Sequence, residues 1–456
     1  MGVDPAARTR RRARAFLGAR SRSHWRERRP VGKIGAVSST KTWAGTYTFT
    51  APRLVEAQSI DDVREPVAAG GRVRALGTRH SFNDLADTRG TLVTVTDIPA
   101  DPVLDEGART VTVGAGTRYG VLATWLQDRG WALHNLGSLP HISIGGAIAT
   151  GTHGSGHGNG VLSTAVRAVT YVDAAGGLTT VTRGDAEFDG LVVGLGAYGI
   201  VVRVTLDVQP TFDVRQDVFH GLPWDALLDD LDALTGAAYS VSVFTTWDEP
   251  TLDQTWRKTR LDDGAPVPDR WYGVAAATGS EGRIVAGSED NLTTQGGVPG
   301  PWSQRLPHFR LDSTPSNGDE IQTEYFVDRR VAADALRALR TRAPRIARVL
   351  LVSELRTAAA DGLWLSPAYE RDVLAIHFTW QNRPDAVRAL LPEIEATLAP
   401  FDARPHWGKF HGMSPQAVAR VTPRLDDARA LFERLDPEGV FSGPHLERLG
   451  LRDRRA

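Results

Sequence analysis

Two segments carry polar side chains at a spacing that suits a shared chemical site. In VLLVSELRT, Glu354 and Arg356 alternate with apolar residues, and in VLAIHFTW, His377 and Thr379 do the same. Successive side chains of a strand point to opposite faces, so one sheet could present all four together. Lys409 in HWGK adds a further cation in an aromatic setting. Such groups can bind polar ligands and transfer protons, although a solvated sheet face with an ordinary Glu–Arg pair is the alternative.

A second stretch could hold a diphosphate without any cationic side chain. Residues 137–160, GSLPHISIGGAIATGTHGSGHGNG, contain eight glycines and three histidines but no acid, lysine or arginine. Dense glycine lets backbone N–H groups approach a bound group, and SIGGAIAT (143–150) predicts a buried helix start that adds further amides. A flexible Gly/Ser linker is the alternative, but such linkers seldom carry three isoleucines and a Leu-Pro pair. The stretch is neither a Walker loop nor a clean GxGxxG motif.

The segments that must position these residues predict an α+β fold of interleaved short strands and helices. Strands are expected at TYTFT, VRAL, TLVTV and TVTVGAG. A capping box at Ser59 and Asp62 predicts one helix, and another is expected from Tyr119 to about Asp128. After the glycine-rich stretch, VRAVTYVDA and LTTVT predict a hairpin.

Beyond Pro210 the strands become longer and glycine rarer. Amphipathic helices are expected near residues 223–236 and 330–342. The polar, Pro/Gly-rich stretch 262–318 predicts surface loops, and a helix-rich tail follows Phe410.

Composition excludes several classes of protein. The 456 residues are 41% hydrophobic, with 12 Trp and 14 Phe, which is enough for a sizeable core. The absence of cysteine excludes disulfides, Fe–S clusters, thiolate zinc sites and cysteine nucleophiles, and no metal site is expected. No run of 18 apolar residues is present to span a membrane.

The first 38 residues differ sharply in charge from the rest. They hold ten arginines and Lys33 against Asp4 and Glu27, a formal charge of +9, which leaves −10 for the remainder of a chain at −1. This acidic remainder argues against a nucleic-acid surface on the folded part. The arginines begin like a twin-arginine export signal, but no apolar segment follows them. We therefore expect residues 1–38 to be a disordered extension, whose presence in the sequence an incorrectly chosen start site would also explain. The protein is expected to be cytoplasmic and monomeric.

Seven motifs together resemble the vanillyl-alcohol-oxidase type of FAD flavoprotein and, within it, the alditol (xylitol) oxidases. They are VRALGTRHSFND, NLGSLPHISIGGAIATGTHGSG, LGAYGIVVRVTL, PGPWSQRLPHF, SELRTAAAD, AIHFTW and ARPHWGK, in this order along the chain. Sugar-lactone oxidases share several of them. The resemblance implies a two-domain fold. An FAD-binding domain would comprise residues 39–213 and a C-terminal segment, 410–456, and a substrate (cap) domain, 214–409, would place an antiparallel sheet over the flavin ring.

The resemblance also implies where FAD is bound. His80, in a GxxHS-like turn, would be bonded to the flavin 8α-methyl group, and the lack of cysteine excludes a second, thioether link. Arg79 stands where many relatives have glycine. The residues implied to hold the cofactor are Gly77, Thr78, Arg79, His80, Ser81, Phe82, Asn83, Ser138, Ser143, Gly146, Thr150, Gly151, Thr152, His153, Gly154, Gly199 and Ile200.

The substrate implied by the resemblance is a polyol. The implied polyol-binding residues are Ser138, Glu354, Arg356, His377, Thr379 and Lys409. A primary alcohol of a xylitol- or sorbitol-like alditol would lose hydride to flavin N5 and become the aldose. Arg356 and Lys409 would stabilise the developing alkoxide, and His377 would accept the proton, directly or through Lys409. Glu354 and Ser138 would bind hydroxyls further along the substrate.

Gly137 precedes the implied substrate serine, where, by resemblance, a bulkier side chain would obstruct the approach of dioxygen to the flavin. Its lack of a side chain predicts an oxidase that releases hydrogen peroxide. The alternative is that Gly137 only shapes the Ser-Leu-Pro turn that follows it.

Other functions remain open at this point. An aldonolactone oxidase or dehydrogenase, acting on a gulonolactone-like substrate, shares several motifs. A flavin-fold protein that only binds carbohydrate would be expected to carry a damaged site, whereas all six implied polyol positions here have the expected residue type.

Overall fold

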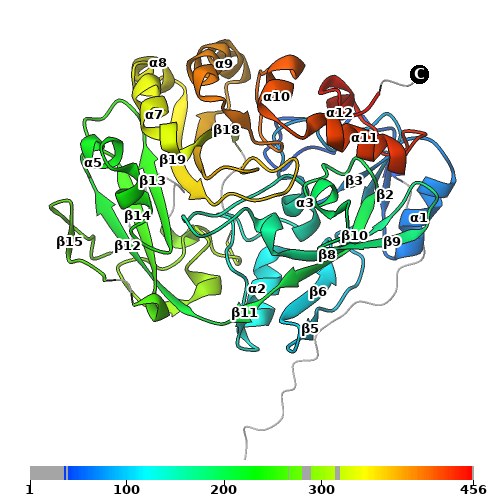
Figure 1. The fold of residues 1–456 in the computed structure, drawn as a ribbon, viewed down its shortest axis with the longest axis horizontal. Coiled ribbons are helices and arrows are strands. Elements are labelled where there is room, and N and C mark those ends of the chain that lie inside the picture. Colours follow the sequence, from blue (N-terminus) through cyan, green and yellow to red (C-terminus); the bar gives the residue numbers. More distant parts are fainter. Residues whose placement is uncertain (1–34, 37–39, 265, 280–288, 314–318, 454–456) are drawn as a thin grey trace, which may run out of the picture. The chain divides into compact units, whose positions relative to one another are not determined.

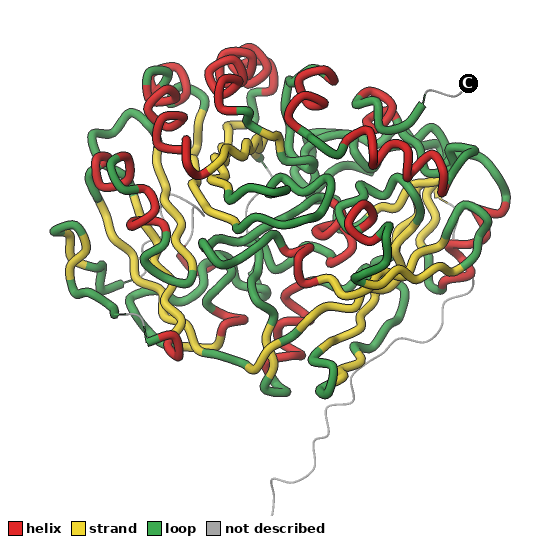
Figure 2. The backbone as a smooth tube through the Cα atoms, in the orientation of Figure 1, coloured by secondary structure: helices red, strands yellow, loops and turns green. Residues whose placement is uncertain are grey.

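The computed structural model describes residues 35–36, 40–264, 266–279, 289–313 and 319–453. The extension expected over residues 1–38 therefore lies outside the described residues, apart from the two that form β1. The described part interleaves helices with largely antiparallel sheets, which confirms the α+β class (Figures 1 and 2). Within it, no helix has both the length and the apolar character needed to cross a bilayer.

The first sheet has four strands in the order β1-β2-β4-β3. They are β1 (Gly35–Ala36), β2 (Arg53–Glu56), β3 (Val73–Leu76) and β4 (Thr91–Thr94). β4 runs parallel to both β2 and β3, and α1 (Ile60–Ala68) makes the crossover between β2 and β3. The predicted capping box is present, because Ser59 and the Asp62 side chain satisfy each other's backbone N–H groups. TYTFT is not a full strand and forms only a bridge between Thr48 and Lys41.

The second sheet is antiparallel, with the order β5-β6-β10-β8-β9. Its strands are β5 (Val103–Asp105), β6 (Thr110–Gly114), β8 (Val166–Val172), β9 (Leu178–Thr182) and β10 (Ile200–Asp207). The expected hairpin is β8–β9. The helices here are α2 (Tyr119–Gln127), α3 (Ile144–Ala149), η1 (Leu162–Ala165) and α4 (Phe188–Leu191), and the short pair β7 (Trp131–Ala132) and β11 (Gln209–Pro210) lies beside them. α3 is the helix predicted within the glycine-rich stretch, and it contacts β10.

The third sheet is an eight-stranded antiparallel sheet of order β17-β12-β14-β13-β19-β20-β18-β21. Its strands are β12 (Asp213–His220), β13 (Ser240–Thr245), β14 (Gln254–Arg260), β17 (Gly300–Pro301), β18 (Glu320–Asp328), β19 (Leu350–Ala358), β20 (Val373–Gln381) and β21 (Arg404–Pro405). A small hairpin, β15 (Arg270–Trp271) with β16 (Val274–Ala275), lies outside it. The predicted alternation holds, since Glu354 on β19 lies opposite His377 on β20.

Helices cover one face of this large sheet (Figure 1). They are α5 (Trp224–Leu228), α6 (Leu231–Thr235), η5 (Arg329–Val331), α7 (Ala332–Arg340), α8 (Ala343–Ile346), α9 (Pro384–Leu398) and η6 (Ala399–Phe401). Leu355 and Ile376 of the sheet pack in one core with Leu336 of α7 and Leu391 of α9. Because side chains alternate, the neighbouring Glu354 must face the opposite side of the sheet, away from α7 and α9.

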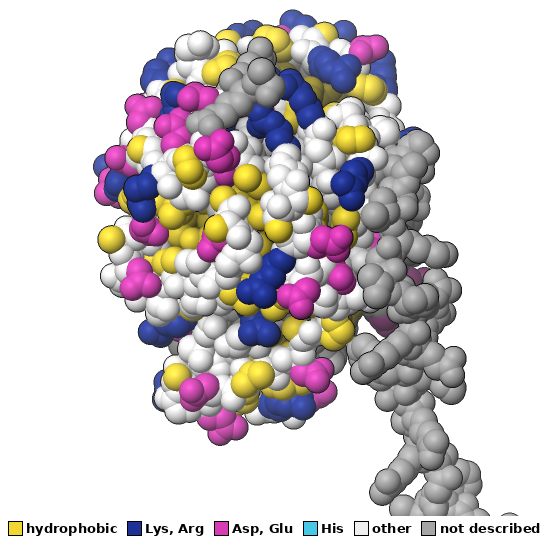
Figure 3. Space-filling view, turned by 90° about the vertical axis from the view of Figure 1, so that its right-hand side faces the viewer, with side chains coloured by type: hydrophobic (Ala, Val, Ile, Leu, Met, Phe, Trp, Pro, Cys, Tyr) yellow, Lys and Arg dark blue, Asp and Glu magenta, His cyan; other side chains and the backbone are white. Residues whose placement is uncertain are grey.

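The C-terminal helices return to the first sheet. They are α10 (Pro415–Val421), α11 (Leu425–Leu435) and α12 (Pro444–Arg448). The Val73 N–H of β3 donates to the Val440 carbonyl at 2.8 Å, and Phe441 and Leu446 are buried in the same core as Val73. The tail is helical, as its sequence predicted. Over the face drawn in Figure 3, basic and acidic side chains are interspersed.

Two further expectations were wrong in detail. The helix expected near 223–236 is split into α5 and α6, because Asp230 caps α6 by accepting from the Ala233 N–H at 3.0 Å. The stretch 262–318 is not all surface loop in its described parts. It contains the 3₁₀ turns η2 (Leu261–Asp263), η3 (Glu289–Asn291) and η4 (Trp302–Gln304), and the Trp302 side chain in the last is fully buried.

Candidate active site

A cavity of about 590 Å³ lies where the three sheets' loops and strands converge. One part of its wall comes from the turn after β3 and from the glycine-rich stretch. The opposite part comes from β18, β19 and β20, on the face that points away from α7 and α9. Both chemical signals of the sequence therefore meet in one place.

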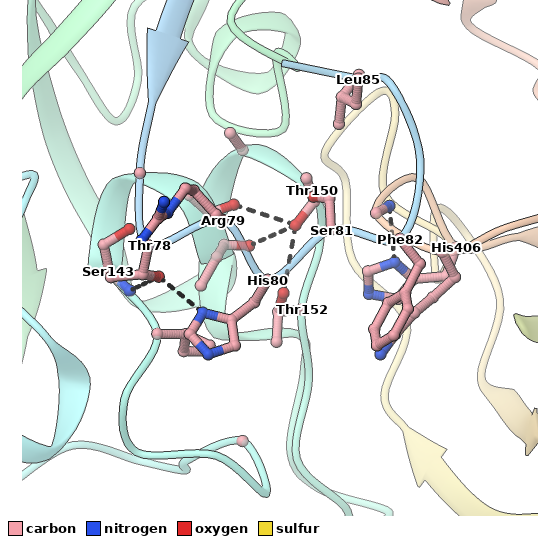
Figure 4. Close-up of a pocket in the computed structure, with 18 of the residues that line it drawn as sticks. Thr78, Arg79, His80, Ser81, Phe82, Leu85, Ser143, Thr150, Thr152 and His406 are labelled. Atoms are coloured by element: carbon pink, nitrogen blue, oxygen red, sulfur yellow. Dashed lines mark hydrogen bonds between the residues drawn. The ribbon is translucent and has the colours of Figure 1, made fainter. Parts of the chain in front are cut away.

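The turn after β3 holds His80 by a short chain of hydrogen bonds (Figure 4). Thr78 Oγ1 lies 3.0 Å from His80 Nδ1 and accepts from the Ser143 N–H at 3.1 Å. The His80 ring also stacks on Trp43, with 5.3 Å between ring centroids. Burial, with smaller effects from neighbouring cations, lowers the pKa of His80 to about 3, so the ring is neutral.

This wall fits a flavin nucleotide. His80 Nε2 is buried without a hydrogen-bond partner, and such an atom in a cavity calls for a bound group. The wall beside it includes backbone without a side chain at Gly77, where a Cβ would lie 2.6 Å from Ser143 Oγ and would force that hydroxyl to move. Arg79 has φ 66°, a left-handed conformation that favours glycine and that an arginine tolerates at some cost.

Most of the residues predicted to hold FAD line the cavity. These are Gly77, Thr78, Arg79, His80, Ser81, Phe82, Ser138, Ser143, Gly146, Thr150, Thr152, His153 and Gly199, and Gly137 lies among them. The others, Asn83, Gly151, Gly154 and Ile200, do not line it.

Each of these other residues has a structural role instead. The Asn83 amide donates to the carbonyls of Trp407 and Lys409, both at 2.8 Å. Gly151 adopts a positive φ of 66° in the turn after α3. Gly154 passes so close to the Leu136 carbonyl that a Cβ would lie 2.5 Å from it, and Ile200 is fully buried at the start of β10.

All six residues predicted to bind a polyol line the cavity. Glu354, Arg356, His377 and Thr379 lie on strands of the opposite wall, whereas Ser138 belongs to the glycine-rich stretch and Lys409 follows β21. Arg356 is at the centre of this group: Nη1 donates to Ser138 Oγ at 3.1 Å, Nη2 donates to Glu324 Oε1 at 3.2 Å, and Nε lies 3.5 Å from Glu354 Oε1. Glu354 and Arg356 are only 6% and 7% exposed. The alternative of a solvated Glu–Arg pair is therefore wrong, since both charges are buried in a cavity wall.

Two residues of β18 that line the cavity, Gln322 and Glu324, were not predicted from the sequence. Gln322 Oε1 accepts a hydrogen bond from Lys409 Nζ and lies 3.1 Å from His377 Nε2. Glu324 Oε1 lies 3.0 Å from His153 Nε2 and also accepts from Arg356. The signal was present, because EIQTEYFVD alternates in the same way as the two strands that were singled out.

Burial and neighbouring charges set the protonation states of the side chains on this wall. Burial lowers the pKa of His377 to about 3, although the Glu324 carboxylate opposes this shift, so the imidazole is neutral. If Nε2 donates to Gln322, then Nδ1 is the proton acceptor. Burial alone would raise the pKa of Glu354, but Arg356 and His308 hold it well below its ordinary value, so Glu354 is a carboxylate. Burial also lowers the pKa of Lys409.

Comparison with known proteins gives matches over nearly the whole chain. The family described as FAD binding domain matches residues 51–182, and the family described as D-arabinono-1,4-lactone oxidase matches residues 317–449. The alditol oxidase of a Streptomyces species is 43% identical over 417 residues, which cover 90% of this chain and 99% of that protein.

A more distant relative and a solved structure also match over most of the chain. The L-gulono-1,4-lactone dehydrogenase of Mycobacterium tuberculosis is 28% identical over 426 residues, covering 89% of this chain and 98% of that protein. The crystal structure of cholesterol oxidase from B. sterolicum superposes with a TM-score of 0.73 over 92% of this chain and 97% of that chain, at 15% identity. At that identity the likeness concerns the fold alone.

Proposed function

The chain belongs to the alditol oxidase family of flavoproteins with the vanillyl-alcohol-oxidase-type fold, and from this we propose that it is an FAD-dependent oxidoreductase that converts a primary alcohol of a sugar alcohol into the aldose. The observation that carries the proposal is the buried pair of Arg356 and Glu354, with Ser138 hydrogen-bonded to Arg356, in the same cavity as His80. The lactone-oxidising relatives that match over about nine tenths of this chain are less similar, at 25–28% identity against 43%.

We propose that FAD binds along the glycine-rich wall and is attached covalently through His80. The buried and unpartnered Nε2 supports this, as does the neutral state of the ring, because only a neutral imidazole nitrogen has a lone pair to form a bond. When bound, FAD supplies the hydride acceptor and then reduces dioxygen to hydrogen peroxide. Gly137, on the same wall, would leave the approach of dioxygen open.

On the opposite wall the protein supplies position and charge. Arg356 is fixed by two carboxylates and Ser138 before any ligand binds, so its field needs no rearrangement to stabilise an alkoxide. Lys409 is held by Gln322 and contributes a second positive charge. The neutral His377 would accept the hydroxyl proton, and the Glu354 carboxylate would accept hydrogen bonds from hydroxyls further along the polyol.

A substrate panel tests the proposal. Xylitol, sorbitol, glycerol and gulonolactone are compared as substrates of the flavin-loaded enzyme, with hydrogen peroxide as the readout. We expect the highest kcat/KM with a five- or six-carbon alditol. A preference for gulonolactone would instead assign the protein to aldonolactone oxidation, which the match of residues 317–449 to a lactone oxidase family makes the second candidate. Consumption of no substrate by a fully loaded enzyme would support a carbohydrate-binding role.

We further propose that the protein is cytoplasmic and monomeric and that its folded body does not bind nucleic acid. We also propose that residues 39–213 and 410–456 form an FAD-binding domain and that residues 214–409 form a substrate domain.

A further inference from the structure

Next to Glu354 lies a buried lysine–histidine pair that the proposed reaction does not use, and its histidine, His308, also lines the cavity. Lys258 on β14 is 1% exposed and His308 is 4% exposed. Lys258 Nζ donates to the Leu306 carbonyl and lies 3.1 Å from His308 Nδ1. His308 Nε2 lies 2.6 Å from Glu354 Oε1. The three side chains thus form one continuous hydrogen-bonded chain that ends at a residue of the polyol wall.

The chemistry of the lysine sets the direction of this chain. Burial lowers the pKa of Lys258 to about 7 and that of His308 to about 4, so between these values Lys258 is mainly an ammonium group and His308 is neutral. An ammonium group has only donors, so His308 Nδ1 then accepts from Lys258 and the ring proton resides on Nε2. His308 therefore donates to Glu354 and cannot accept from it. Arg356 Nε approaches the same oxygen, Oε1, at 3.5 Å. Both neighbours thus occupy Oε1, which leaves Oε2 to accept from a hydroxyl in the cavity.

The histidine is also held rigidly in place. Its ring packs against Trp256 and Phe244, with centroid distances of 4.8 and 5.8 Å. The backbone N–H groups of His308 and Phe309 both donate to the Ser138 carbonyl, at 3.1 and 3.2 Å. The segment that orients Glu354 therefore also fixes Ser138, the other residue proposed to contact the distal hydroxyls.

We infer that Lys258 and His308 are positioning residues that set the preference for longer polyols, by fixing the tautomer of His308 and so the orientation of the Glu354 carboxylate. The inference rests on the proposed polyol oxidation. Without Lys258, the imidazole can take either tautomer, and the one protonated on Nδ1 would turn a lone pair toward the carboxylate. Glu354 would then have to rotate or to take up a proton, and its contact with a distal hydroxyl would be lost.

The experiment compares a long and a short substrate in variants of the flavin-loaded enzyme. The variants are Lys258→Met, His308→Leu and His308→Gln, with Thr259→Val as the matched control. Thr259 is the next residue of β14, is buried, and its Oγ1 has no hydrogen-bond partner, so the control perturbs the same strand without breaking a bond. The substrates are xylitol and 1,2-propanediol, which has no distal hydroxyls, and steady-state turnover is followed with an artificial electron acceptor.

We expect Lys258→Met and His308→Leu to raise KM for xylitol about tenfold or more, and to change kcat for xylitol and kcat/KM for 1,2-propanediol much less. His308→Gln should restore most of the loss, because an amide can accept from Lys258 and donate to Glu354 at once. Equal losses on both substrates, or a His308→Gln variant as impaired as His308→Leu, would overturn the inference. If the wild type instead prefers gulonolactone, the proposed function fails, and the same variants are then compared on that substrate. There, unchanged KM in Lys258→Met would refute the positioning role.

Discussion

At the scale of single residues, the site is built from groups whose charge states are fixed by burial before a ligand arrives. Glu354 remains a carboxylate because Arg356 and His308 adjoin it, whereas His80 and His377 are neutral because they are buried. The cavity therefore contains fixed charges together with neutral imidazoles. A neutral imidazole can accept a hydroxyl proton, and a fixed cation can stabilise the alkoxide that remains.

His80 should retain the flavin through a covalent bond. We expect the purified protein to stay yellow after acid precipitation, and His80→Ala to release its FAD to the supernatant. His220→Ala, at the exposed end of β12, is the control and should behave as the wild type. Complete loss of flavin from the wild-type precipitate would refute the attachment.

Glu354 should act on substrate. Glu354→Gln keeps the shape of the side chain but removes the charge. We expect it to lower kcat/KM for xylitol by a factor that corresponds to a loss of about 2–4 kcal/mol in transition-state stabilisation. The exposed Glu433, paired with Arg429 on α11 at 2.9 Å, provides the control, because such a surface pair contributes only about 0–1 kcal/mol. Near-normal kinetics of Glu354→Gln would show that the residue serves stability alone.

Gly137 should control reoxidation by dioxygen. A Cβ at this position would meet its nearest neighbours, including the His153 carbonyl, at 3.7 Å, so Gly137→Ala fits without strain. We expect Gly137→Ala, and more so Gly137→Val, to slow reoxidation about tenfold or more, a barrier increase of about 1.4 kcal/mol, while reduction by polyol is largely retained. Stopped-flow measurement of both half-reactions separates this result from a general defect, in which reduction and reoxidation would slow together.

At the scale of elements, the site strands β19 and β20 could be predicted from the sequence, but the role of the loop that carries His308 could not. Alternation on β19 and β20 identified Glu354 and His377, because period two is a local property of the chain. The same rule would have found Gln322 on β18. His308 was missed because it lies in a Pro/Gly-rich stretch, and its burial depends on Trp256 and Phe244, which are distant in sequence.

The GxxHS-like turn and the segment that carries Lys409 are coupled through Asn83. Asn83→Ala leaves the carbonyls of Trp407 and Lys409 without their donor, so we expect a loss of about 1–3 kcal/mol in the free energy of unfolding. Because Lys409 is then less well positioned, kcat should fall as well. Asn382→Ala, whose amide bonds Asp319 on the surface, is the control for both measurements. A stability loss with unchanged kcat would show that Lys409 is positioned by Gln322 alone.

At the scale of the whole molecule, Arg74 ties together parts of the chain that are far apart in sequence. Its guanidinium, 2% exposed, donates to the carbonyls of Leu85, Leu195, Gly196 and Phe441 at 2.6, 2.9, 2.7 and 3.1 Å. This one side chain thus connects β3, the turn after it, the second glycine-rich turn and the C-terminal segment.

Arg74→Met should therefore destabilise the whole protein. Several buried carbonyls would lose their donor, and we expect the free energy of unfolding to fall by about 3 kcal/mol or more. Arg53→Met, on the exposed surface of β2, is the control and should change stability by about 0.5 kcal/mol or less. Denaturant unfolding measures both. A similar midpoint for the two variants would show that solvent replaces the guanidinium.

The pairing of β3 with the C-terminal segment has a consequence for synthesis on the ribosome. Val73 bonds to Val440 and Arg74 to Phe441, so the first sheet cannot complete its contacts until almost the entire chain has been translated. The eight-stranded sheet, contained in residues 213–405, is available earlier. We expect limited proteolysis of nascent chains stalled before Val440 to leave residues 213–405 resistant and to cleave the segment that contains the first sheet. Capture of FAD, which needs the turn after β3, would then be a post-translational event.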